Sequence, residues 1–321
     1  MINFSVIIPF KNEKENLQEL LDSLSAQKTQ ANFEVILIDD FSTDAAEPLQ
    51  LDFIKLLHRK DFPDNPKISS KQNAIDIGVS QAKYEYLIFT DADMIFNENW
   101  LENYRVSVED RASTASTGSA TSVDFVFGRT EIIVGGKNGR ILSAPTEILQ
   151  KAQLDFLFAI SFVFCKLGLD GSAMGNNLMI SKKLYEKIGG QAGIGFSLIE
   201  DKKLLSAARK HGAKIFCTKD FSAYAFTKPV PIKKFIQQML RWVKGGFIES
   251  PFLAVALVLF AISNLLIFPS FLLILLLIPV YLKNKISLKY AFLLPFAFFV
   301  ETLILIPSLF FVKLKWKERI I

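Results

Sequence analysis

Cysteine and histidine are scarce in this sequence of 321 residues, and their scarcity excludes two kinds of site. Cys165 and Cys217 stand far apart in apolar surroundings, so they offer neither a disulfide framework nor the close pairs of a zinc site. We expect both to be buried free thiols in a reducing compartment. The histidines, His58 and His211, are isolated, which argues against a histidine metal site.

A dense run of lysine and arginine is also absent. The net charge of +5 and the isoelectric point of about 9.0 suit nucleic acid, an anionic membrane surface or phosphorylated ligands. Because no basic run has interleaved aromatic residues, we expect no nucleic-acid partner; a merely solvated basic surface is the alternative. No basic segment precedes the apolar pattern at 4–9, which argues against a signal peptide.

Charge itself is missing from two long stretches near the C-terminus. Residues 251–282 carry none and residues 290–312 carry only Glu301, in a chain that is 50% hydrophobic with a mean hydropathy of +0.30. A helix needs about 20 apolar residues to cross a bilayer, so we predict transmembrane helices and contact with membrane lipid in a region at 248–321. The first stretch is either one strongly tilted helix or a hairpin broken at Pro269.

Basic residues flank these apolar stretches on both sides. They are Lys228, Lys233, Lys234, Arg241 and Lys244 before the first, Lys283, Lys285 and Lys289 after it, and Lys313, Lys315, Lys317 and Arg319 after the second. Basic clusters stay in the cytoplasm and suit docking on anionic lipid. We therefore expect a multi-pass protein of the inner (cytoplasmic) membrane with its N-terminal domain facing the cytoplasm. Glu301 should face protein or water.

The part of the chain before residue 248 alternates strand and helix patterns. Apolar runs predict strands at 4–9, 33–38 and 84–89, and 3.6-residue periodicity predicts helices at 13–26 and 71–82. Continuous Val/Ile/Leu runs separated by helices are typical of a mostly parallel sheet covered on both faces. The sequence therefore predicts an α/β domain at 1–247.

Three further segments of this domain have a distinctive composition. Residues 112–122 are almost all Ala, Ser, Thr and Gly, which predicts a mobile surface loop before a strand at 123–127. Residues 154–165 are nearly all apolar but too few to span a bilayer. They form either a buried helix or a helix lying against the membrane face.

Carboxylates follow two of the predicted strands. Asp91 and Asp93 come after the strand at 84–89, and Asp39 and Asp40 after the strand at 33–38. Strand ends of an α/β sheet meet at the crevice where ligands bind, and paired carboxylates suit a hard divalent cation that also contacts phosphates. A single Asp-x-Asp pair is as well explained by a helix cap, but two acidic strand ends in one sheet favour a site.

Seven short motifs follow one another within a stretch of about residues 5–246. The first three are a Pro-x-x-Asn-Glu pattern at 9–13, an Asp-Asp-x-Ser-Thr-Asp turn at 39–44 and a Ser-Lys-x-x-Ala-x-Asp-x-Gly helix at 70–78. The next four are Asp91-Ala92-Asp93, Gly175-Asn176-Asn177, Glu200-Asp201 and a Gln-x-x-Arg-Trp pattern at 238–242.

In this order the motifs resemble those of the family 2 glycosyltransferases, inverting enzymes with the Rossmann-like GT-A fold. The Gln-x-x-Arg-Trp pattern is similar to that of membrane-embedded members such as cellulose and hyaluronan synthases. Each motif is short, and their order carries the resemblance. The chain departs from the family pattern where Phe41 and Ser70 replace glycine and Asp76 replaces asparagine.

The resemblance implies a donor site and a metal site. Asp40 would accept a hydrogen bond from the nucleobase, uracil, and Lys71 would meet the diphosphate. Asp93 and Asp91 would hold Mg²⁺ or Mn²⁺ against both phosphates. Pro9, Asn12, Glu13 and Asp91 complete the donor-binding set. Taken alone, Asp40 reads equally as a turn residue and Lys71 as a solvated helix lysine.

The resemblance also implies a catalytic and an acceptor side. Asp201 would be the general base that deprotonates the acceptor hydroxyl. The residues on the acceptor side would be Gly175, Asn176, Asn177, Glu200, Gln238, Arg241 and Trp242. Without the resemblance, Glu200 and Asp201 would simply complement a helix N-terminus, and Arg241 and Trp242 would suit a membrane interface.

The sequence thus predicts a metal-dependent glycosyltransferase of cell-envelope polysaccharide synthesis. It would move a sugar from a nucleotide diphosphate donor, a UDP-sugar, to a lipid-linked or glycan acceptor with inversion. One alternative is a processive polysaccharide synthase, which the Gln-x-x-Arg-Trp motif favours and the short membrane region disfavours. Another is a catalytically silent membrane scaffold that only binds nucleotide sugar. The four aspartates at 40, 91, 93 and 201 argue against the scaffold.

Overall fold

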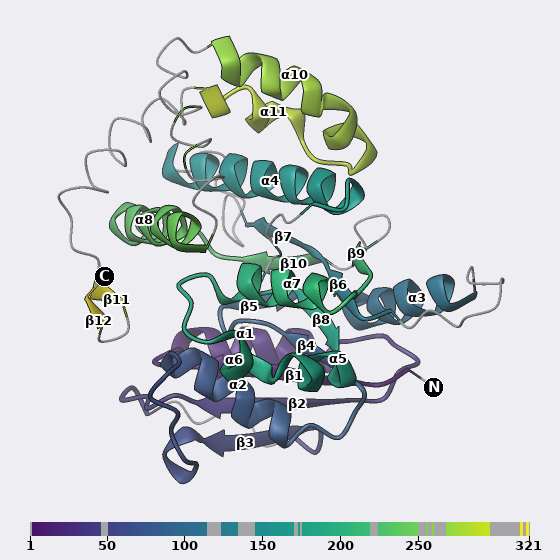
Figure 1. Ribbon diagram of the computed structural model, residues 1–321, viewed down its shortest axis with the longest axis vertical. Helices are drawn as coiled ribbons and strands as arrows, with labels where there is room; N and C mark the ends of the chain where they lie inside the picture. Colours follow the sequence, from purple (N-terminus) through teal and green to yellow (C-terminus); the bar gives the residue numbers. More distant parts are fainter. Residues whose placement is uncertain are drawn as a thin grey trace. The chain divides into compact units, whose positions relative to one another are not determined.

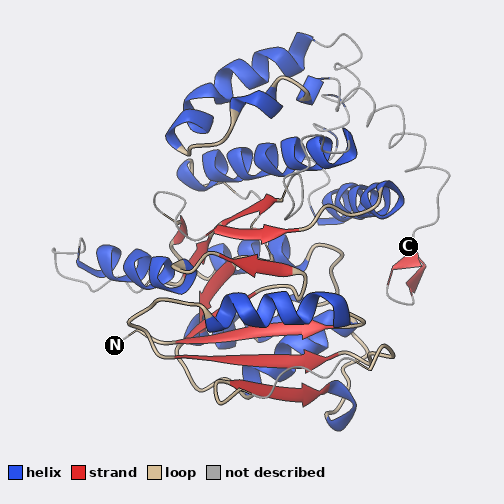
Figure 2. Ribbon diagram, turned by 180° about the vertical axis from the view of Figure 1, so that it is seen from behind, coloured by secondary structure: helices blue, strands red, loops and turns tan. Residues whose placement is uncertain are grey.

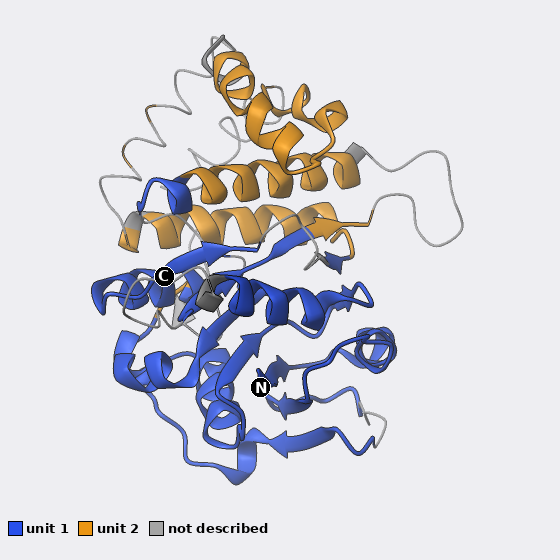
Figure 3. Cartoon of the chain, turned by 90° about the vertical axis from the view of Figure 1, so that its right-hand side faces the viewer, with its two compact units in different colours: residues 1–130, 164–196, 200–227 blue, residues 131–163, 197–199, 228–321 orange. Residues whose placement is uncertain are grey.

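The computed structural model describes most of the chain, shown as ribbons in Figure 1. The described residues are 2–45, 51–113, 123–133, 145–169, 173, 175–218, 224–249, 255, 259, 268–295, 315–316 and 319–320. They divide into two compact units (Figure 3). The first contains residues 1–130, 164–196 and 200–227, and the second contains residues 131–163, 197–199 and 228–321.

A seven-stranded sheet forms the centre of the first unit, in the order β3-β2-β1-β4-β8-β6-β9. Its strands are β1 (Phe4–Phe10), β2 (Phe33–Asp39), β3 (Ile54–His58), β4 (Tyr86–Phe89), β6 (Phe125–Phe127), β8 (Leu178–Ser181) and β9 (Ile215–Cys217). Only β8 among these seven strands runs opposite to its neighbours. The predicted α/β fold with a mostly parallel central sheet, as in the GT-A fold, is therefore confirmed.

Helices cover both faces of this sheet because the strands are apolar on both faces. Helix α1 (Lys14–Ser25) packs its leucines with Phe4, Val6 and Ile8 on one face (Figure 2). Helix α2 (Ser70–Ser80) lies on the other face with α5 (Lys182–Ile188) and α6 (Gly190–Ile194) (Figure 1). There Gly78 allows the approach, since a Cβ on it would lie 2.6 Å from Ile7 Cγ2.

The remaining elements of the first unit include a second, three-stranded sheet. Its order is β5-β10-β7, with β5 (Met94–Phe96), β10 (Tyr224–Thr227) and β7 (Arg129–Ile132), whose last residues belong to the second unit. The other elements are a 3₁₀ turn, η1 (Arg59–Asp61), and helices α3 (Trp100–Ser113) and α7 (Glu200–Lys210). A buried polar residue ties α3 to the core: Trp100 Nε1 and Tyr104 Oη both donate to Asn177 Oδ1 at 2.8 Å.

The second unit is built from helices. They are α4 (Pro145–Lys166), most of which belongs to this unit, α8 (Ile232–Glu249), α10 (Phe268–Lys283) and α11 (Leu288–Ala291). Phe235, Met239 and Leu240 of α8 form a buried cluster against which Leu149 and Val230 pack. The buried Gln150 side chain exchanges two hydrogen bonds with the backbone of Val230, at 2.8 and 2.9 Å. A short pairing of β11 (Lys315–Trp316) with β12 (Arg319–Ile320) lies near the C-terminus.

The apolar segment predicted at 154–165 belongs to a longer helix than expected. Helix α4 begins at Pro145, and its span 146–166 is the one helix in the described chain long and apolar enough to cross a membrane. Residues buried inside the structure make up 44% of its most apolar window, and a core helix of a soluble protein passes the same test. The predicted segment is thus part of a 22-residue helix, and the alternatives of a buried helix and a helix lying against the membrane face both stay predictions.

Several predictions fall on residues outside the described part. These include most of the loop at 112–122, residues 260–267 of the first apolar stretch, and residues 296–312 of the second with Glu301. Helix α10 begins at Phe268, beside Pro269, but the tilted-helix and hairpin alternatives both stay predictions. So does the boundary after residue 247, with which the two compact units do not coincide.

Candidate functional site

Two loops at the carboxyl ends of β1 and β2 are joined by hydrogen bonds around Asn12. The Asn12 carboxamide oxygen accepts from the Thr43 N–H at 2.7 Å, and its own N–H donates to Ser42 Oγ at 3.0 Å. Asn12 has φ 57°, a left-handed conformation that asparagine adopts more readily than most residues. Lys14 N–H donates to Asp44 at 2.9 Å. The predicted motifs at 9–13 and 39–44 therefore form one continuous edge.

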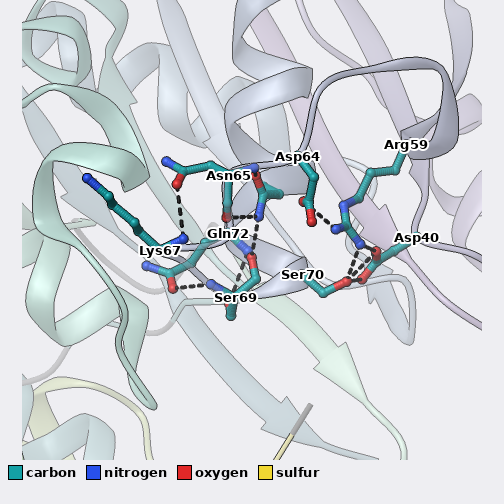
Figure 4. A network of polar contacts seen from close by, with 9 residues as sticks. Asp40, Arg59, Asp64, Asn65, Lys67, Ser69, Ser70 and Gln72 are labelled. Atoms are coloured by element: carbon teal, nitrogen blue, oxygen red, sulfur yellow. Dashed lines mark hydrogen bonds and ion pairs between the residues drawn. The ribbon is translucent and has the colours of Figure 1, made fainter. Parts of the chain in front are cut away.

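Asp40 is a buried member of a network of polar contacts, at the end that contains Arg59 and Ser70 (Figure 4). It accepts hydrogen bonds from Arg59 Nη1 at 2.6 Å and from Ser70 Oγ at 2.5 and 2.6 Å. Arg59 is 8% exposed and also contacts Asp64 at 2.5 Å. Its hydrogen bonds to both carboxylates raise the pKa of Arg59, although burial alone would lower it. Arg59 therefore fixes the carboxylate that the sequence predicted to face the nucleobase.

Sequence reasoning missed Arg59, because it follows β3 in a stretch without a recognisable motif. Its guanidinium carbon also lies 4.9 Å from the ring centroid of Phe41, a cation–π contact. Phe41 stands where the family has glycine, and it has φ 60° with 49% exposure.

A pocket with an empty volume of about 330 Å³ lies where α2, β4 and α7 meet. Four charged residues line it: Lys71, Asp91, Glu200 and Asp201. Lys71 Nζ lies 2.7 Å from Asp91 Oδ1 and 3.0 Å from Glu200 Oε1. Burial would lower the pKa of Lys71, but these two carboxylates raise it well above its usual range. The lysine is therefore a fixed cation that joins the strand end to the start of α7.

Asp201 is positioned by the glycine predicted to lie on the acceptor side. The Gly175 N–H donates to Asp201 Oδ2 at 3.1 Å, and a Cβ on residue 175 would lie 2.8 Å from Asp201 Cβ. Asp201 stands in the first turn of α7, where the helix dipole favours a carboxylate. It therefore presents an ionisable oxygen at the pocket.

Asp91 and Asp93 are the residues expected to hold a divalent cation. Burial and the nearby charges of Asp91 and Glu13 raise the pKa of the Asp93 carboxyl to about 6. A cation would relieve this repulsion. Within the described residues, no three His, Cys, Asp or Glu side chains gather closely enough to hold a metal by themselves. Mg²⁺ is commonly bound by one or two carboxylates with phosphate oxygens and waters, so the pair fits such an ion.

The two asparagines of the predicted acceptor motif take part in the internal packing. Asn176 Oδ1 accepts from Thr130 Oγ1 at 2.8 Å, and its carbonyl accepts from Thr90 Oγ1 at 2.8 Å. Asn177 is 0% exposed, and its side chain bonds Trp100, Tyr104 and the Arg129 carbonyl. With no exposed surface, the Asn177 side chain holds the core together and cannot contact an acceptor in this structure.

The Gln-x-x-Arg-Trp motif lies on α8, in the second unit. Gln238, Arg241 and Trp242 are all partly exposed. Arg241 Nη1 donates to the carbonyl of Leu198 at 2.8 Å, within the same unit. The acceptor-side role of these three residues stays a prediction.

Thr90 and Gln191 also line the pocket, and sequence reasoning assigned a role to neither. Thr90 follows β4 directly and precedes the predicted metal motif, which was a usable signal. Gln191 lies in α6, after two glycines, and nothing in the local pattern distinguishes it from a surface glutamine.

Comparisons with known proteins bear on this arrangement. The family model described as "Glycosyl transferase family 2" matches residues 5–157, and the model described as "Glycosyl transferase family group 2" matches residues 146–312. The two matches together span the pocket residues and the motif on α8.

Two curated proteins resemble this chain over about half of its length. Glycosyltransferase GlyG of Streptococcus pneumoniae is 30% identical over 161 residues, 48% of this chain and 51% of GlyG. The poly(ribitol-phosphate) beta-N-acetylglucosaminyltransferase TarS of Staphylococcus aureus is 28% identical over 163 residues, 48% of this chain and 28% of TarS. The chain thus matches about half of GlyG and less of TarS.

Among solved structures, S. aureus TarS 1–349 in complex with UDP aligns with 77% of this chain and 66% of its own. The TM-score is 0.45 and the sequence identity 19%.

Proposed function

The chain belongs to the family 2 glycosyltransferases, and from that membership we propose that it transfers a sugar from a nucleotide diphosphate donor, a UDP-sugar, to an acceptor hydroxyl with inversion. One observation carries the proposal: Lys71, Asp91, Glu200 and Asp201 come from three separate motifs and line a single pocket. A scaffold that only held nucleotide would not need a carboxylate positioned beside that pocket.

Asp201 has the general-base role in this proposal. As the acceptor oxygen bonds to the anomeric carbon, its proton passes to a carboxylate oxygen of Asp201. The bond from that carbon to the diphosphate breaks, and its electron pair leaves with the phosphate oxygen. The hydrogen bond from Gly175 holds Oδ2, so Asp201 needs little reorganisation when the acceptor arrives.

Asp91 and Asp93 are the residues that would hold Mg²⁺ or Mn²⁺ in this proposal. When bound, the cation supplies positive charge to the departing diphosphate. Lys71 already neutralises Asp91 and Glu200, so it meets a phosphate only by exchanging one of these partners. Asp40, held by Arg59, is the proposed acceptor for the nucleobase.

The acceptor and the membrane belong to the same proposal. The relative TarS is named for glycosylating poly(ribitol-phosphate), a polymer that carries hydroxyl groups, and this favours a polymeric acceptor here. A lipid-linked or glycan acceptor of the cell envelope is the form that the motifs suggest. The charge-free stretch at 251–282 and the lysines after it favour an anchor at the cytoplasmic membrane. If the anchor exists, full-length chain stays in the membrane pellet after an alkaline wash; release into the supernatant contradicts it.

The function is tested with purified full-length chain and a panel of nucleotide sugars, by measuring released nucleotide and labelled product. We expect turnover with a UDP-sugar, loss of turnover in excess chelator, and recovery with Mg²⁺ or Mn²⁺. Binding without release of nucleotide would favour the silent scaffold. Full activity in chelator would remove the metal from the proposal, and long products would favour the processive synthase.

A further inference from the structure

Gln191 is a buried polar residue that the proposed chemistry leaves unused. It is 1% exposed, stands in α6 and lines the same pocket as Lys71 and Asp201. Buried amides are normally hydrogen-bonded, and each exception calls for an explanation. Among the described residues, the hydrogen bonds of Gln191 use the oxygen of its side-chain amide but not the nitrogen.

Helix α2 holds Gln191 at both backbone and side chain. Its N–H donates to Asp76 Oδ1 at 2.8 Å, while the next N–H, of Ala192, donates to Asp76 Oδ2 at 3.0 Å. Its side-chain Oε1 accepts from Gln72 Nε2 at 3.2 Å. Gly190 permits this approach, since it has φ +65° and a Cβ on it would lie 2.7 Å from Asp76 Oδ1. Gln191 is therefore fixed before any ligand arrives.

The Nε2 amino group of Gln191 has no such partner. In the described part of the chain, none of the hydrogen bonds of Gln191 uses this nitrogen as a donor. Nε2 is also not among the enclosed side-chain nitrogen and oxygen atoms of the described chain that lack a partner, so it reaches the accessible surface of the pocket. A rigid, unsatisfied amide donor at a pocket wall is what a ligand with an acceptor oxygen would use.

The charges of the pocket decide which ligand group that oxygen belongs to. Three carboxylates, Asp91, Glu200 and Asp201, face a single ammonium, that of Lys71. This surplus of negative charge does not oppose a neutral hydroxyl, whereas a phosphate oxygen needs the cation of the proposed function to offset it. A hydroxyl can donate to a carboxylate and accept from an amide at the same time, so it matches both kinds of group in the pocket.

The walls of the pocket agree with a sugar ring. Ligand sites combine mostly apolar walls with a few placed polar groups, and this pocket has both. Ile75, Phe89 and Leu178 supply apolar surface for the C–H face of such a ring.

We infer that Gln191 recognises the transferred sugar, by donating a hydrogen bond from Nε2 to one of its hydroxyl oxygens. This inference rests on the proposed function and adds a specificity-determining residue to it. Asp76, through the two N–H groups that it accepts, is a positioning residue for Gln191.

Two substitutions separate this role from a structural one. Gln191→Leu removes both the donor and the acceptor that Gln72 uses. Gln191→Glu at pH 8 keeps an acceptor for Gln72 but removes the donor. A purely structural role through Gln72 would therefore be impaired in the leucine variant alone, whereas loss of the sugar contact would appear in both.

Binding is measured by calorimetry with UDP and with UDP-GlcNAc, together with any UDP-sugar that the panel shows to be turned over. Both variants should bind UDP within twofold of wild type and bind the UDP-sugar about three- to tenfold more weakly. Gln150→Leu, at an equally buried glutamine of α4 that does not line the pocket, is the control and should change neither affinity.

Three results would overturn the inference while leaving the proposed function intact. They are unchanged affinity for the UDP-sugar, an equal loss of affinity for UDP, and a loss confined to Gln191→Leu. If wild type binds neither UDP nor any UDP-sugar of the panel, the UDP-sugar donor of the proposed function fails, and this inference fails with it.

Discussion

The backbone N–H of Gly175 and the carboxylate of Asp201 meet across 3.1 Å, and the close approach leaves no room for a side chain at residue 175. A Cβ there would lie 2.8–3.0 Å from three atoms of Asp201. The glycine therefore sets where the proposed base stands.

Gly175→Ala is expected to displace Asp201 and lower the transfer rate by about 10- to 100-fold, because small misplacements of catalytic groups are costly. UDP affinity, measured by calorimetry, should stay the same. Gly246→Ala is the control, since a Cβ there would meet nothing within 4 Å. A variant that transfers at the wild-type rate would show that Asp201 tolerates the shift or is not the base.

Asp201→Asn separates chemistry from binding, because asparagine has nearly the same shape but cannot take the acceptor's proton. Transfer should fall by about 10²-fold or more, while UDP affinity is retained. Asp40→Ala should do the reverse and weaken UDP binding first. Calorimetry and product release on both variants make the test. Wild-type transfer by Asp201→Asn would make Glu200 the next candidate.

Arg59→Met tests the buried network around Asp40. Removing the guanidinium leaves the Asp40 carboxylate buried without its cation, which costs about 3–5 kcal/mol of stability. UDP affinity should fall as well if Asp40 binds the nucleobase. Asp64→Asn is the matched control, because Asp64 contacts the same arginine but has a side chain that is 59% exposed. This substitution should lower the free energy of unfolding by less than about 1 kcal/mol. Equal thermal unfolding of both variants would contradict the central role of Arg59.

Glu102 gives a pH-dependent prediction in the first unit. Hydrogen bonds from Arg105, and further ones from Gln30 N–H and Thr29, lower the pKa of Glu102 to about 2, against 4.5 ordinarily. A carboxyl with a lowered folded-state pKa stabilises the protein above its unfolded pKa, and that contribution is lost as pH falls towards 2. Glu102→Gln should therefore cost about 1 kcal/mol at pH 7, allowing for solvent screening, and less below pH 4.5.

Glu109→Gln is the control for that experiment, because Glu109 contacts the same Arg105 but is 50% exposed. Glu109→Gln should change the free energy of unfolding by no more than about 0.5 kcal/mol at every pH. Chemical denaturation at pH 7, 5 and 3.5 makes the comparison. The prediction is contradicted if the loss of unfolding free energy in Glu102→Gln, relative to wild type, does not become smaller as the pH falls.

Adjacent glycines of α8 give a matched pair in the second unit. A Cβ on Gly245 would lie 3.0–3.2 Å from Ile199 and Leu198, whereas one on Gly246 would meet nothing within 4 Å. Gly246→Ala should raise the free energy of unfolding by about 0.5–1 kcal/mol, because alanine lowers the backbone entropy of the unfolded chain. In Gly245→Ala, crowding against Ile199 and Leu198 should cancel that increase. Thermal unfolding in detergent, followed by tryptophan fluorescence, should rank Gly246→Ala above Gly245→Ala. The opposite ranking would contradict the packing against Ile199.

The local sequence determined the strands and helices of the N-terminal part, and with them the edge where the motifs lie. Apolar runs at 33–38 and 84–89 became β2 and β4, and the helix predicted at 71–82 became α2. These elements are set by side-chain periodicity over a few residues, so neighbours in the chain suffice to predict them. Ser69, with its capping box to Gln72, begins α2 for an equally local reason.

Tertiary structure alone decided which residues share the pocket. Lys71, Asp91 and Glu200 are distant in sequence, and only the assembly of the sheet and helices brings both carboxylates within 3.0 Å of the Lys71 ammonium. The same packing buried Asn177 in the core, although its motif suggested an acceptor contact, and brought Gln191 to the pocket wall without any motif. Local patterns report which face of an element is apolar, but contacts between distant elements depend on how the whole sheet is assembled.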